Sequence, residues 1–374
     1  MNAMQHAGLL SAAVMVAVGL SACGGGGATA STTPTTPVSS CAAKYPVTHI
    51  TASIAAPTTW SACNVYAVDS SISVNSALTI QPGAVVKFAT GVPGGTQLTV
   101  SSTGTINANG TSTNGIVFTS YTDDSAGGDS NGDGTLTTPL VGDWGMIVLN
   151  SSGSVFNYAK FYYGGAFKTT LQIGGNLNYS ATVTNSTFAH NNGGDVVDSF
   201  GPIGVLDAAF ATSATVITGN TFYANKVPLR ISGLFSVDDS NTFHDPANAA
   251  SINLYNGIFL IGHSAKPITG VITFSATEVP YVLSGSIEIP LGSTLTIGNN
   301  VAFKFFAGIS QMWFTGTVVN STGTGVVFTS LKDDTVKGDT NGDGPSVGAA
   351  GDWYGIHNAA GNWTTLPNEF FHLY

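Results

Sequence analysis

An internal duplication with a spacing of about 210 residues constrains the fold of this chain more than any other feature. The acidic stretch FTSYTDDSAGGDSNGDG at 118–134 is repeated as FTSLKDDTVKGDTNGDG at 328–344. GDWGMI and GDWYGI follow the two stretches, and the upstream flanks match as well, so the copies cover 66–147 and 281–356. Each copy consists of short alternating strands, Gly or Asn turns and one acidic loop. Repeats of this length, built from such short strands, indicate several coils of a solenoid.

Composition excludes several other classes of protein. The chain has 374 residues, of which 47 are Gly, 43% are hydrophobic and 8% are charged. Disordered chains need more charge and fewer apolar residues, and long amphipathic helices need more Glu, Lys and Arg on their polar faces. The 10 basic residues form no cluster and are outnumbered by 20 acidic ones, which disfavours nucleic acid as a partner. We therefore predict an all-β protein.

A shorter repeat lies between the two copies. Asn220-Thr221-Phe222 recurs as Asn241-Thr242-Phe243, and Ser186-Thr187-Phe188 precedes both. Asn191 and Asn225 follow the first two of these phenylalanines in the chain at the same distance. Phe at one place on successive coils predicts a ring stack in the interior, and Asn predicts a ladder of side-chain amides along a turn. This pattern favours a parallel β-helix over an antiparallel sandwich, because hairpin signals are sparse.

The duplicated motifs carry a family resemblance. LTIQPGAVVKF at 78–88, the acidic stretch and GDWGMI resemble the repeated strings of bacterial surface proteins with a pectin-lyase-like right-handed β-helix. The resemblance is close over 66–147 and 281–356 and loose between them. It implies a right-handed parallel β-helix, but not an activity, since that fold serves lyases, hydrolases and adhesins alike.

The N-terminal segment predicts export and a lipid anchor. Residues 7–20 are an apolar stretch, too short to span a bilayer and typical of a signal-peptide core. Leu20-Ser21-Ala22-Cys23 resembles the lipobox of bacterial lipoproteins, and Gly24 after the Cys implies the outer membrane. We therefore expect a lipoprotein signal peptide over 1–22, lipidation at Cys23, a flexible Gly/Ser/Thr/Pro tether over 23–40 and the β-helix over 41–374.

Cysteine use agrees with export. With Cys23 lipidated, Cys41 and Cys63 remain as an even pair in an oxidising compartment. A disulfide that joins the start of the β-helix is the favoured interpretation, and two buried thiols are the alternative.

The acidic loops are the strongest candidates for a metal site. DSNGDG at 129–134 and DTNGDG at 339–344 match the first half of an EF-hand loop, in which oxygens converge and Gly permits a sharp turn. Both lack the closing Glu, so the closing ligand must come from an Asp before or after the loop. A carboxylate-rich oxygen cage suits Ca²⁺ better than Mg²⁺, and a solvated loop held by Asx turns is the alternative. The candidate ligands are Asp123, Asp129, Asn131, Asp133 and Asp143 in the first copy, and Asp333, Asp339, Asn341, Asp343 and Asp352 in the second.

A catalytic alternative depends on the central segment, where acids and bases gather. The candidate residues are Lys226, Arg230, Asp238, Asp239 and His244. Such groups could serve a polysaccharide lyase or glycoside hydrolase that acts on an acidic polysaccharide. Their order along the chain does not match the polygalacturonase-like pattern, and the seven His form no zinc motif.

These patterns together predict a cell-surface lipoprotein rather than an enzyme, with a calcium-stabilised β-helix that binds or adheres to carbohydrate or another surface ligand. The last coil should have no successor, with Phe370, Phe371 and Tyr374 beside its open edge. Because open edges recruit further strands, self-association through this edge is a further expectation.

Overall fold

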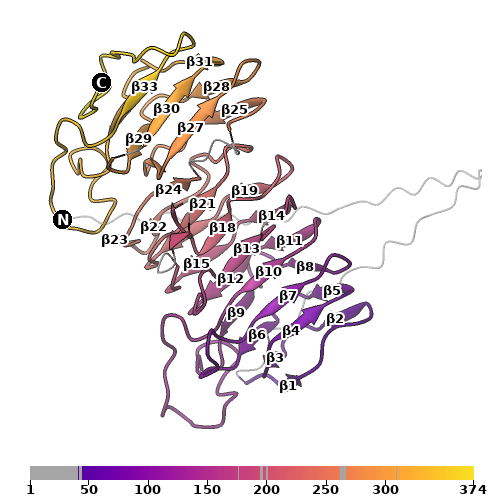
Figure 1. Ribbon diagram of the computed structural model, residues 1–374. Helices are drawn as coiled ribbons and strands as arrows, with labels where there is room; N and C mark the ends of the chain where they lie inside the picture. The colour runs from indigo at the N-terminus through magenta and orange to yellow at the C-terminus, as the bar shows by residue number, and fades with distance from the viewer. Residues whose placement is uncertain are drawn as a thin grey trace, which may run out of the picture. The chain divides into compact units, whose positions relative to one another are not determined.

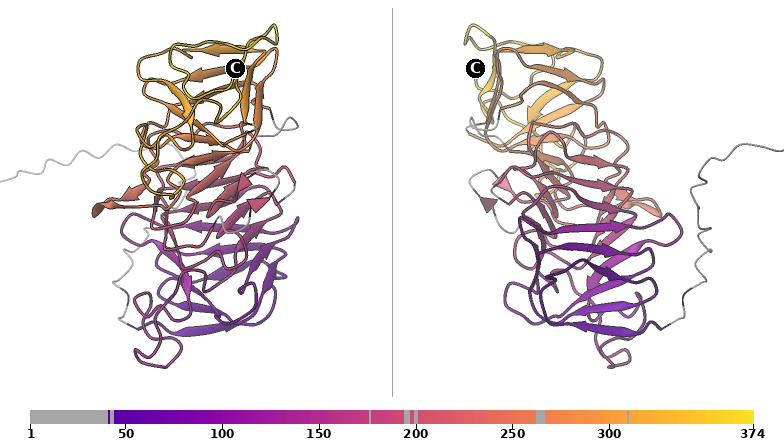
Figure 2. Two further views of the ribbon diagram at one scale, coloured as in Figure 1. Left: turned by 60° about the vertical axis from the view of Figure 1, so that its left-hand side comes forward. Right: turned by 90° about the vertical axis from the view of Figure 1, so that its right-hand side faces the viewer.

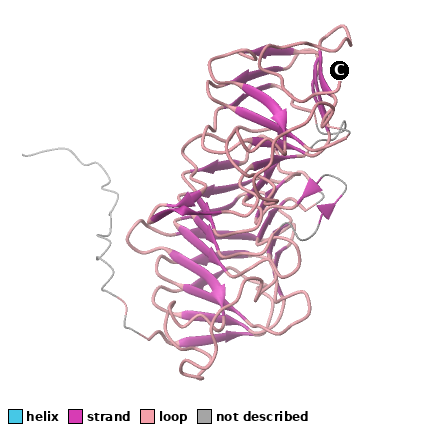
Figure 3. Ribbon diagram, turned by 90° about the vertical axis from the view of Figure 1, so that its left-hand side faces the viewer, coloured by secondary structure: helices cyan, strands magenta, loops and turns pink. Residues whose placement is uncertain are grey.

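The computed structural model describes residues 41, 44–175, 177–193, 197–198, 201–261, 267–308 and 310–374. Strands and loops make up these residues, and no helix occurs among them (Figure 3). The described chain accordingly has no helix long and apolar enough to cross a membrane. The expected signal peptide, the tether and Cys23 lie outside the described residues. Residues 41–374 form one compact unit, in which the strands are stacked coil upon coil (Figure 1).

Three parallel sheets enclose the interior of the first coils, and each coil contributes one strand to each sheet in chain order. The first sheet contains β1 (Val47–Ile50), β3 (Val65–Val68), β6 (Val85–Phe88), β9 (Ile116–Ser120), β12 (Ala159–Tyr162), β15 (Thr187–Ala189) and β20 (Thr221–Tyr223). The third sheet contains β2 (Thr58–Trp60), β5 (Ala77–Ile80), β8 (Thr105–Asn109), β11 (Ser154–Asn157), β14 (Ala181–Thr184) and β19 (Val216–Thr218). The parallel pairing confirms the predicted β-helix.

The second sheet is the longest and runs through both copies. Its strands are β4 (Ile72–Val74), β7 (Leu98–Val100), β10 (Ile147–Leu149), β13 (Leu171–Ile173), β18 (Leu206–Ala208), β21 (Leu229–Ile231), β24 (Ile258–Leu260), β26 (Tyr281–Leu283), β29 (Ala302–Phe305) and β32 (Val327–Ser330).

Two short sheets complete the coils of the second copy. One contains β25 (Val271–Phe274), β28 (Thr294–Ile297) and β31 (Thr317–Val319), and the other contains β27 (Ser286–Ile289), β30 (Gln311–Phe314) and β33 (Gly355–His357). Two antiparallel hairpins, β16 (Val197–Asp198) with β17 (Gly201–Pro202) and β22 (His244–Asp245) with β23 (Asn248–Ile252), lie outside these parallel sheets (Figure 2).

The strands form here because their apolar residues alternate with residues that face outward. In β5, Leu78 and Ile80 are buried while Ala77 and Thr79 are exposed. The inward residues of successive coils lie in register, so side chains of one kind stack along the interior. The predicted Phe stack is confirmed: the ring centroids of Phe161 and Phe188 are 4.5 Å apart. The stack continues to Phe222 and Phe243 at 5.2 and 5.5 Å.

The predicted ladder of asparagines is also present. Asn191 Nδ2 donates a hydrogen bond to Asn225 Oδ1 at 3.1 Å, and Asn225 Nδ2 donates to Asn253 Oδ1 at 2.9 Å. The same amides donate to main-chain oxygens of the preceding coil, such as that of Phe161. The ladder therefore satisfies buried polar groups at the corner between the first and second sheets.

Cysteine residues join the first strands of the β-helix. Cys41 and Cys63 form a disulfide with a Cα–Cα distance of 5.4 Å. The bridge closes a short loop that contains β1 and β2. It reduces the conformational entropy of the unfolded chain and so stabilises the first coil by roughly 3 kcal/mol in the loop-entropy model.

The end of the chain pairs with part of the edge that the sequence suggested would be open. Phe328 in β32 forms a parallel bridge with Glu369, and Trp353 forms one with His372. The Glu369 carboxylate is buried and accepts a hydrogen bond from the Ile356 amide at 2.9 Å. Phe370 and Tyr374 stay 45% and 54% exposed. Self-association through this region remains a prediction, which light scattering of the purified protein can check.

Candidate metal centres

The two acidic loops leave equivalent strands of the two copies. Acidic loop 1, defined as residues 121–146, connects β9 to β10 and projects from the stacked coils (Figure 1). Acidic loop 2, defined as residues 331–354, connects β32 to β33. Both turn back over earlier coils: the main-chain oxygen of Gly127 accepts a hydrogen bond from Tyr45, whereas Gly342 lies against Leu254 and Tyr255.

The first aspartate of each loop closes a turn. Asp123 Oδ2 accepts a hydrogen bond from Thr119 at 2.6 Å, and its Oδ1 accepts bonds from the amide and hydroxyl of Ser125. Asp333 repeats this arrangement with Thr329 and Thr335. Both carboxylates are buried, so their oxygens are directed at the main chain of the turn rather than at the rest of the loop.

The last aspartate of each loop ties the loop to its strand. Asp143 accepts hydrogen bonds from Ser120 at 2.6 Å and from the Leu140 amide at 2.9 Å. Asp352 accepts them from Ser330 at 2.7 Å and from the Ala349 amide, and forms an ion pair with Lys332 at 3.2 Å. The candidate ligands Asp123, Asp143, Asp333 and Asp352 therefore have structural partners of their own.

The aspartate that follows each turn-closing aspartate belongs to a cluster of three carboxylates at the centre of the loop. One carboxylate oxygen from each of Asp124, Asp129 and Asp133 lies within 4.8 Å of the other two. Asp334, Asp339 and Asp343 form the same triad in loop 2. Asp124 and Asp334 were not among the ligands expected from sequence. The repeated Asp-Asp pair was the available signal, because its two members point in different directions once the first one closes the turn.

The triads are partly organised by main-chain donors. Asp129 Oδ1 accepts a hydrogen bond from the Gly132 amide at 2.6 Å, and Oδ2 accepts one from the Gly134 amide at 3.1 Å. Asp339 has equivalent bonds from Gly342 and Gly344. The asparagine side chains of the motif also donate to these carboxylates. Asn131 Nδ2 donates a hydrogen bond to Asp133 at 2.9 Å, and Asn341 Nδ2 donates one to Asp343 at 2.8 Å. These turns hold the carboxylates close together, which costs electrostatic repulsion unless a cation lies nearby.

Some oxygens at these centres are buried and lack a partner within the described chain. They are Asp124 Oδ1, Asp133 Oδ1, Asp334 Oδ1 and Asn341 Oδ1. Burial, followed by the charge of Asp129, raises the pKa of Asp124. Burial acts in the same direction on Asp129, but the amides of Gly132 and Gly134 outweigh it and lower the pKa of that carboxyl. Each centre thus combines ionised oxygens with unpartnered acceptors, as a site for a hard cation requires.

A buried lysine that was not expected from the sequence lies beneath each loop. Lys87 Nζ donates to the Gly128 oxygen at 2.8 Å, and Lys304 Nζ donates to the Gly338 oxygen at 2.7 Å and to Thr340 at 2.9 Å. Both side chains are fully buried. Burial lowers the pKa of Lys304 to about 8 and also lowers that of Lys87, while nearby aspartates oppose the shift. Their repeated place in VVKF and AFKF was the signal that could have revealed them.

Comparison with known families places the first of these loops in a recognised domain. Residues 52–179 match the family model described as a pectate-lyase like beta helix domain. This part of the chain is therefore similar to pectate-lyase-like β-helix domains, in agreement with the parallel sheets described above. The matched range contains the whole first copy and ends before the central segment. No curated protein and no solved structure matches the chain.

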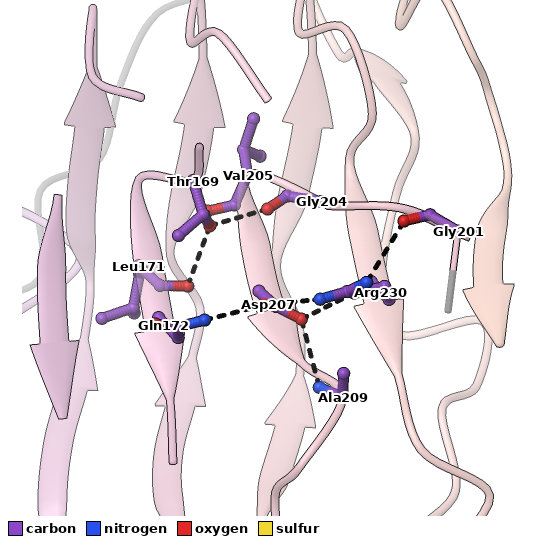
Figure 4. Close-up of polar contacts among 9 residues, drawn as sticks. All are labelled: Thr169, Leu171, Gln172, Gly201, Gly204, Val205, Asp207, Ala209 and Arg230. Atoms are coloured by element: carbon purple, nitrogen blue, oxygen red, sulfur yellow. Dashed lines mark hydrogen bonds and ion pairs between the residues drawn. The ribbon is translucent and has the colours of Figure 1, made fainter. Parts of the chain in front are cut away.

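Arg230, the strongest base among the catalytic candidates, is buried on the second sheet of this β-helix. Its Nε and Nη2 each donate to Asp207 at 2.9 Å, and Gln172 donates to the same carboxylate at 3.1 Å (Figure 4). These three residues come from neighbouring strands β13, β18 and β21 in register. Arg230 and Asp207 are each 1% exposed, so this pair is covered on the outer face of the sheet and does not reach solvent.

The other catalytic candidates contact separate partners. Asp239 accepts hydrogen bonds from Thr277, Asp238 accepts them from Ser240, and His244 Nδ1 lies 2.7 Å from Glu278. Lys226 Nζ lies 6.0 Å from the centre of the Tyr255 ring. These contacts do not bring the five residues into one constellation around a shared reacting position.

Proposed function

We propose that this β-helix is a calcium-stabilised binding module for carbohydrate, held at a bacterial outer membrane by lipid on Cys23. The observation that carries the proposal is the pair of aspartate triads, Asp124/Asp129/Asp133 and Asp334/Asp339/Asp343, at equivalent places in the two copies. The same carboxylates converge in both copies although the strands that carry them belong to different sheets.

Ca²⁺ suits these centres because it takes six to eight oxygen ligands in flexible geometry, whereas Mg²⁺ requires a near-ideal octahedron. The triad carboxylates would hold the ion, with loop main-chain oxygens and water as further ligands. When bound, Ca²⁺ would supply charge compensation for the loop. Lys87 and Lys304 compensate part of that charge from below, since the aspartates act on their pKa values.

Export is supported by the Cys41–Cys63 disulfide, since such bonds persist in oxidising compartments. The lipobox-like Leu20-Ser21-Ala22-Cys23 supports a lipid anchor. Mass spectrometry of the membrane fraction should find the mature chain beginning at an acylated Cys23. An unmodified Cys23 or an intact Met1 would contradict this part of the proposal.

A polysaccharide lyase or hydrolase is the alternative in another functional class. It would need an accessible base, and Arg230 is buried against Asp207. The separate partners of Asp238, Asp239 and His244 do not favour it either. Binding is therefore the function that we propose.

Calcium dependence can be tested by thermal unfolding of the purified protein after removal of metal with EDTA. At a hundredfold excess over Kd, Ca²⁺ should stabilise the fold by about 2.7 kcal/mol per site through mass action. Asp129→Asn with Asp133→Asn should remove the part of this stabilisation that comes from the first site. Asp69→Asn, which lies outside both loops, should leave the Ca²⁺-dependent stabilisation unchanged. An unfolding curve that does not move when Ca²⁺ is added would overturn the proposal.

A further inference from the structure

A groove runs over the outer face of the first sheet beside acidic loop 1. A cavity of about 330 Å³ lies there. Its lining includes Lys160 and Tyr162 of β12, Ser125 of acidic loop 1, and Thr113 and Asn114 of the turn before β9. With Asp123 of acidic loop 1, the lining combines hydroxyl, amide, ammonium and carboxylate groups with apolar strand surface, as a site for a polar organic ligand requires.

Aromatic side chains continue this groove along the stack of coils. Tyr163 and His190 have ring centroids 5.8 Å apart, and Tyr223 lies 5.8 Å from His190 on the next coil. His190 is exposed, and Tyr162, Tyr163 and Tyr223 are partly exposed. We name these four residues the aromatic strip. Tyr162 and Tyr223 are joined by a side-chain hydrogen bond across Ala189, which holds the strip together.

The backbone of the strip takes a conformation that its residues do not favour. Tyr163 and His190 occupy equivalent corners with φ of 61° and 57°, and Ala224 occupies the next corner with φ of 51°. Gly or Asn adopts this left-handed region at lower cost than a bulky side chain. Local strain of this kind clusters at binding sites, because the surrounding structure must hold it in place. Tyr163 and His190 are thus two consecutive aromatic residues held at left-handed corners on this surface.

Charge around the groove indicates the class of ligand. Acidic loop 1 contributes the Asp123 carboxylate to the lining, and the whole chain has a formal net charge of −10. Lys160 is the charged base in the lining. A polyanion would be repelled by the loop, whereas a neutral chain of hydroxyl groups and C–H surface matches the tyrosine tips and ring edges.

We infer that the groove and the aromatic strip bind a neutral hexose oligosaccharide laid along the stack of coils, with acidic loop 1 as one wall. The inference rests on the proposed function and adds to it a location and a ligand class. Because the loop is a wall of the groove, ordering of the loop by Ca²⁺ should strengthen binding.

The corner conformation permits variants that remove the rings without harming the fold. Asn is suited to left-handed corners, so Tyr163→Asn with His190→Asn should keep or raise thermal stability while removing two rings of the strip. Ala224→Asn makes the same backbone change at the third corner and removes no ring. It is therefore the matched control.

Binding is measured by isothermal titration calorimetry with cellohexaose, laminarihexaose and mannohexaose, and with hexagalacturonate as the anionic comparison. At least one neutral hexasaccharide should bind the wild type, the double variant should bind it at least tenfold more weakly, and Ala224→Asn should bind it as the wild type does. The inference is overturned if no neutral probe binds at millimolar concentration, if hexagalacturonate binds more tightly, or if the double variant keeps its affinity. Ca²⁺-dependent melting of the same samples separates failure of the groove from failure of the calcium sites.

Discussion

The first copy places β3, β6 and β9 in the first sheet, whereas the second copy places the equivalent strands β26, β29 and β32 in the second sheet. The local contacts nevertheless repeat closely. Thr119 donates to Asp123 at 2.6 Å and Thr329 donates to Asp333 at 2.7 Å. The repeated segment thus keeps its own turns and loop when its strands extend a different sheet, because these contacts lie within one coil and its neighbours.

What differs is the surroundings of each loop. Loop 1 has no base within its acidic stretch, whereas loop 2 has Lys332 paired with Asp352 and Lys337 bonded to the Thr277 oxygen. Asp334 also accepts hydrogen bonds from Ser346, so it is less free to turn toward an ion. We therefore expect the proposed cation site of the first copy to bind Ca²⁺ more tightly than that of the second.

The largest expected effect comes from the tryptophan that follows each loop. Trp144 stacks on Phe88 at 4.3 Å and donates to the Tyr162 oxygen, while Trp353 stacks on Phe305 at 3.9 Å and donates to the Phe370 oxygen. Each change to Ala should cost about 3–5 kcal/mol locally. Trp144→Ala should lower the stability of the whole stack, whereas Trp353→Ala should loosen only the last coils.

Urea unfolding and amide hydrogen exchange distinguish these outcomes. Phe370→Ala, which removes an exposed ring near the same end, is the control for Trp353→Ala. Equal global destabilisation by the two tryptophan variants would show that both copies unfold as one unit.

A smaller effect concerns pH and the buried lysines. An unfolded lysine has a pKa of about 10.4, and burial lowers the pKa of Lys304 to about 8 in the folded protein. Between these values the unfolded chain binds more protons, so the free energy of unfolding should rise with pH by on the order of 2 kcal/mol. Chemical unfolding at pH 7.5 and 10 should show this rise in wild type and less of it in Lys304→Met.

Lys160→Met, which removes an exposed lysine, should keep the full rise. Lys87→Met should reduce it as Lys304→Met does, since burial acts in the same direction on both pKa values. A rise that survives both buried-lysine variants would exclude these groups as its source.

The smallest expected effect tests the charge difference between the loops directly. Lys332→Thr with Lys337→Gly gives loop 2 the residues of loop 1, and Gly suits the φ of 59° at position 337. Exposed charges contribute little, so the Ca²⁺ affinity of the second site should rise roughly two- to fivefold. Calorimetric titration should show that the Ca²⁺ affinities of the two sites become more alike. Unchanged or weaker Ca²⁺ binding at the second site would mean that these lysines do not cause the difference in affinity between the two sites.

Much of the fold could be predicted because its signals are local and repeated. Alternating strands, the Phe stack through Phe188 and Phe222, and the Asn191–Asn225 ladder all follow from residues that recur at equivalent places. Which carboxylates cluster was harder to predict, since the DSNGDG motif identifies the loop but not which member of the Asp123-Asp124 pair faces its centre. That choice depends on Thr119 and Ser125, whose hydroxyls donate hydrogen bonds to the Asp123 carboxylate in the folded turn.

The sequence by itself determined the β-helix, the duplication and the acidic loops, because each depends on short-range periodicity and on residues that neighbour one another on successive coils. Only the tertiary structure decided which sheet each copy extends, that Lys87 and Lys304 lie beneath the loops, and that Arg230 is buried against Asp207. It also aligned Tyr162, Tyr163, His190 and Tyr223 on one face. These outcomes depend on how many residues each coil contains, and therefore on which side chains meet across coils, a property that no single stretch of sequence carries.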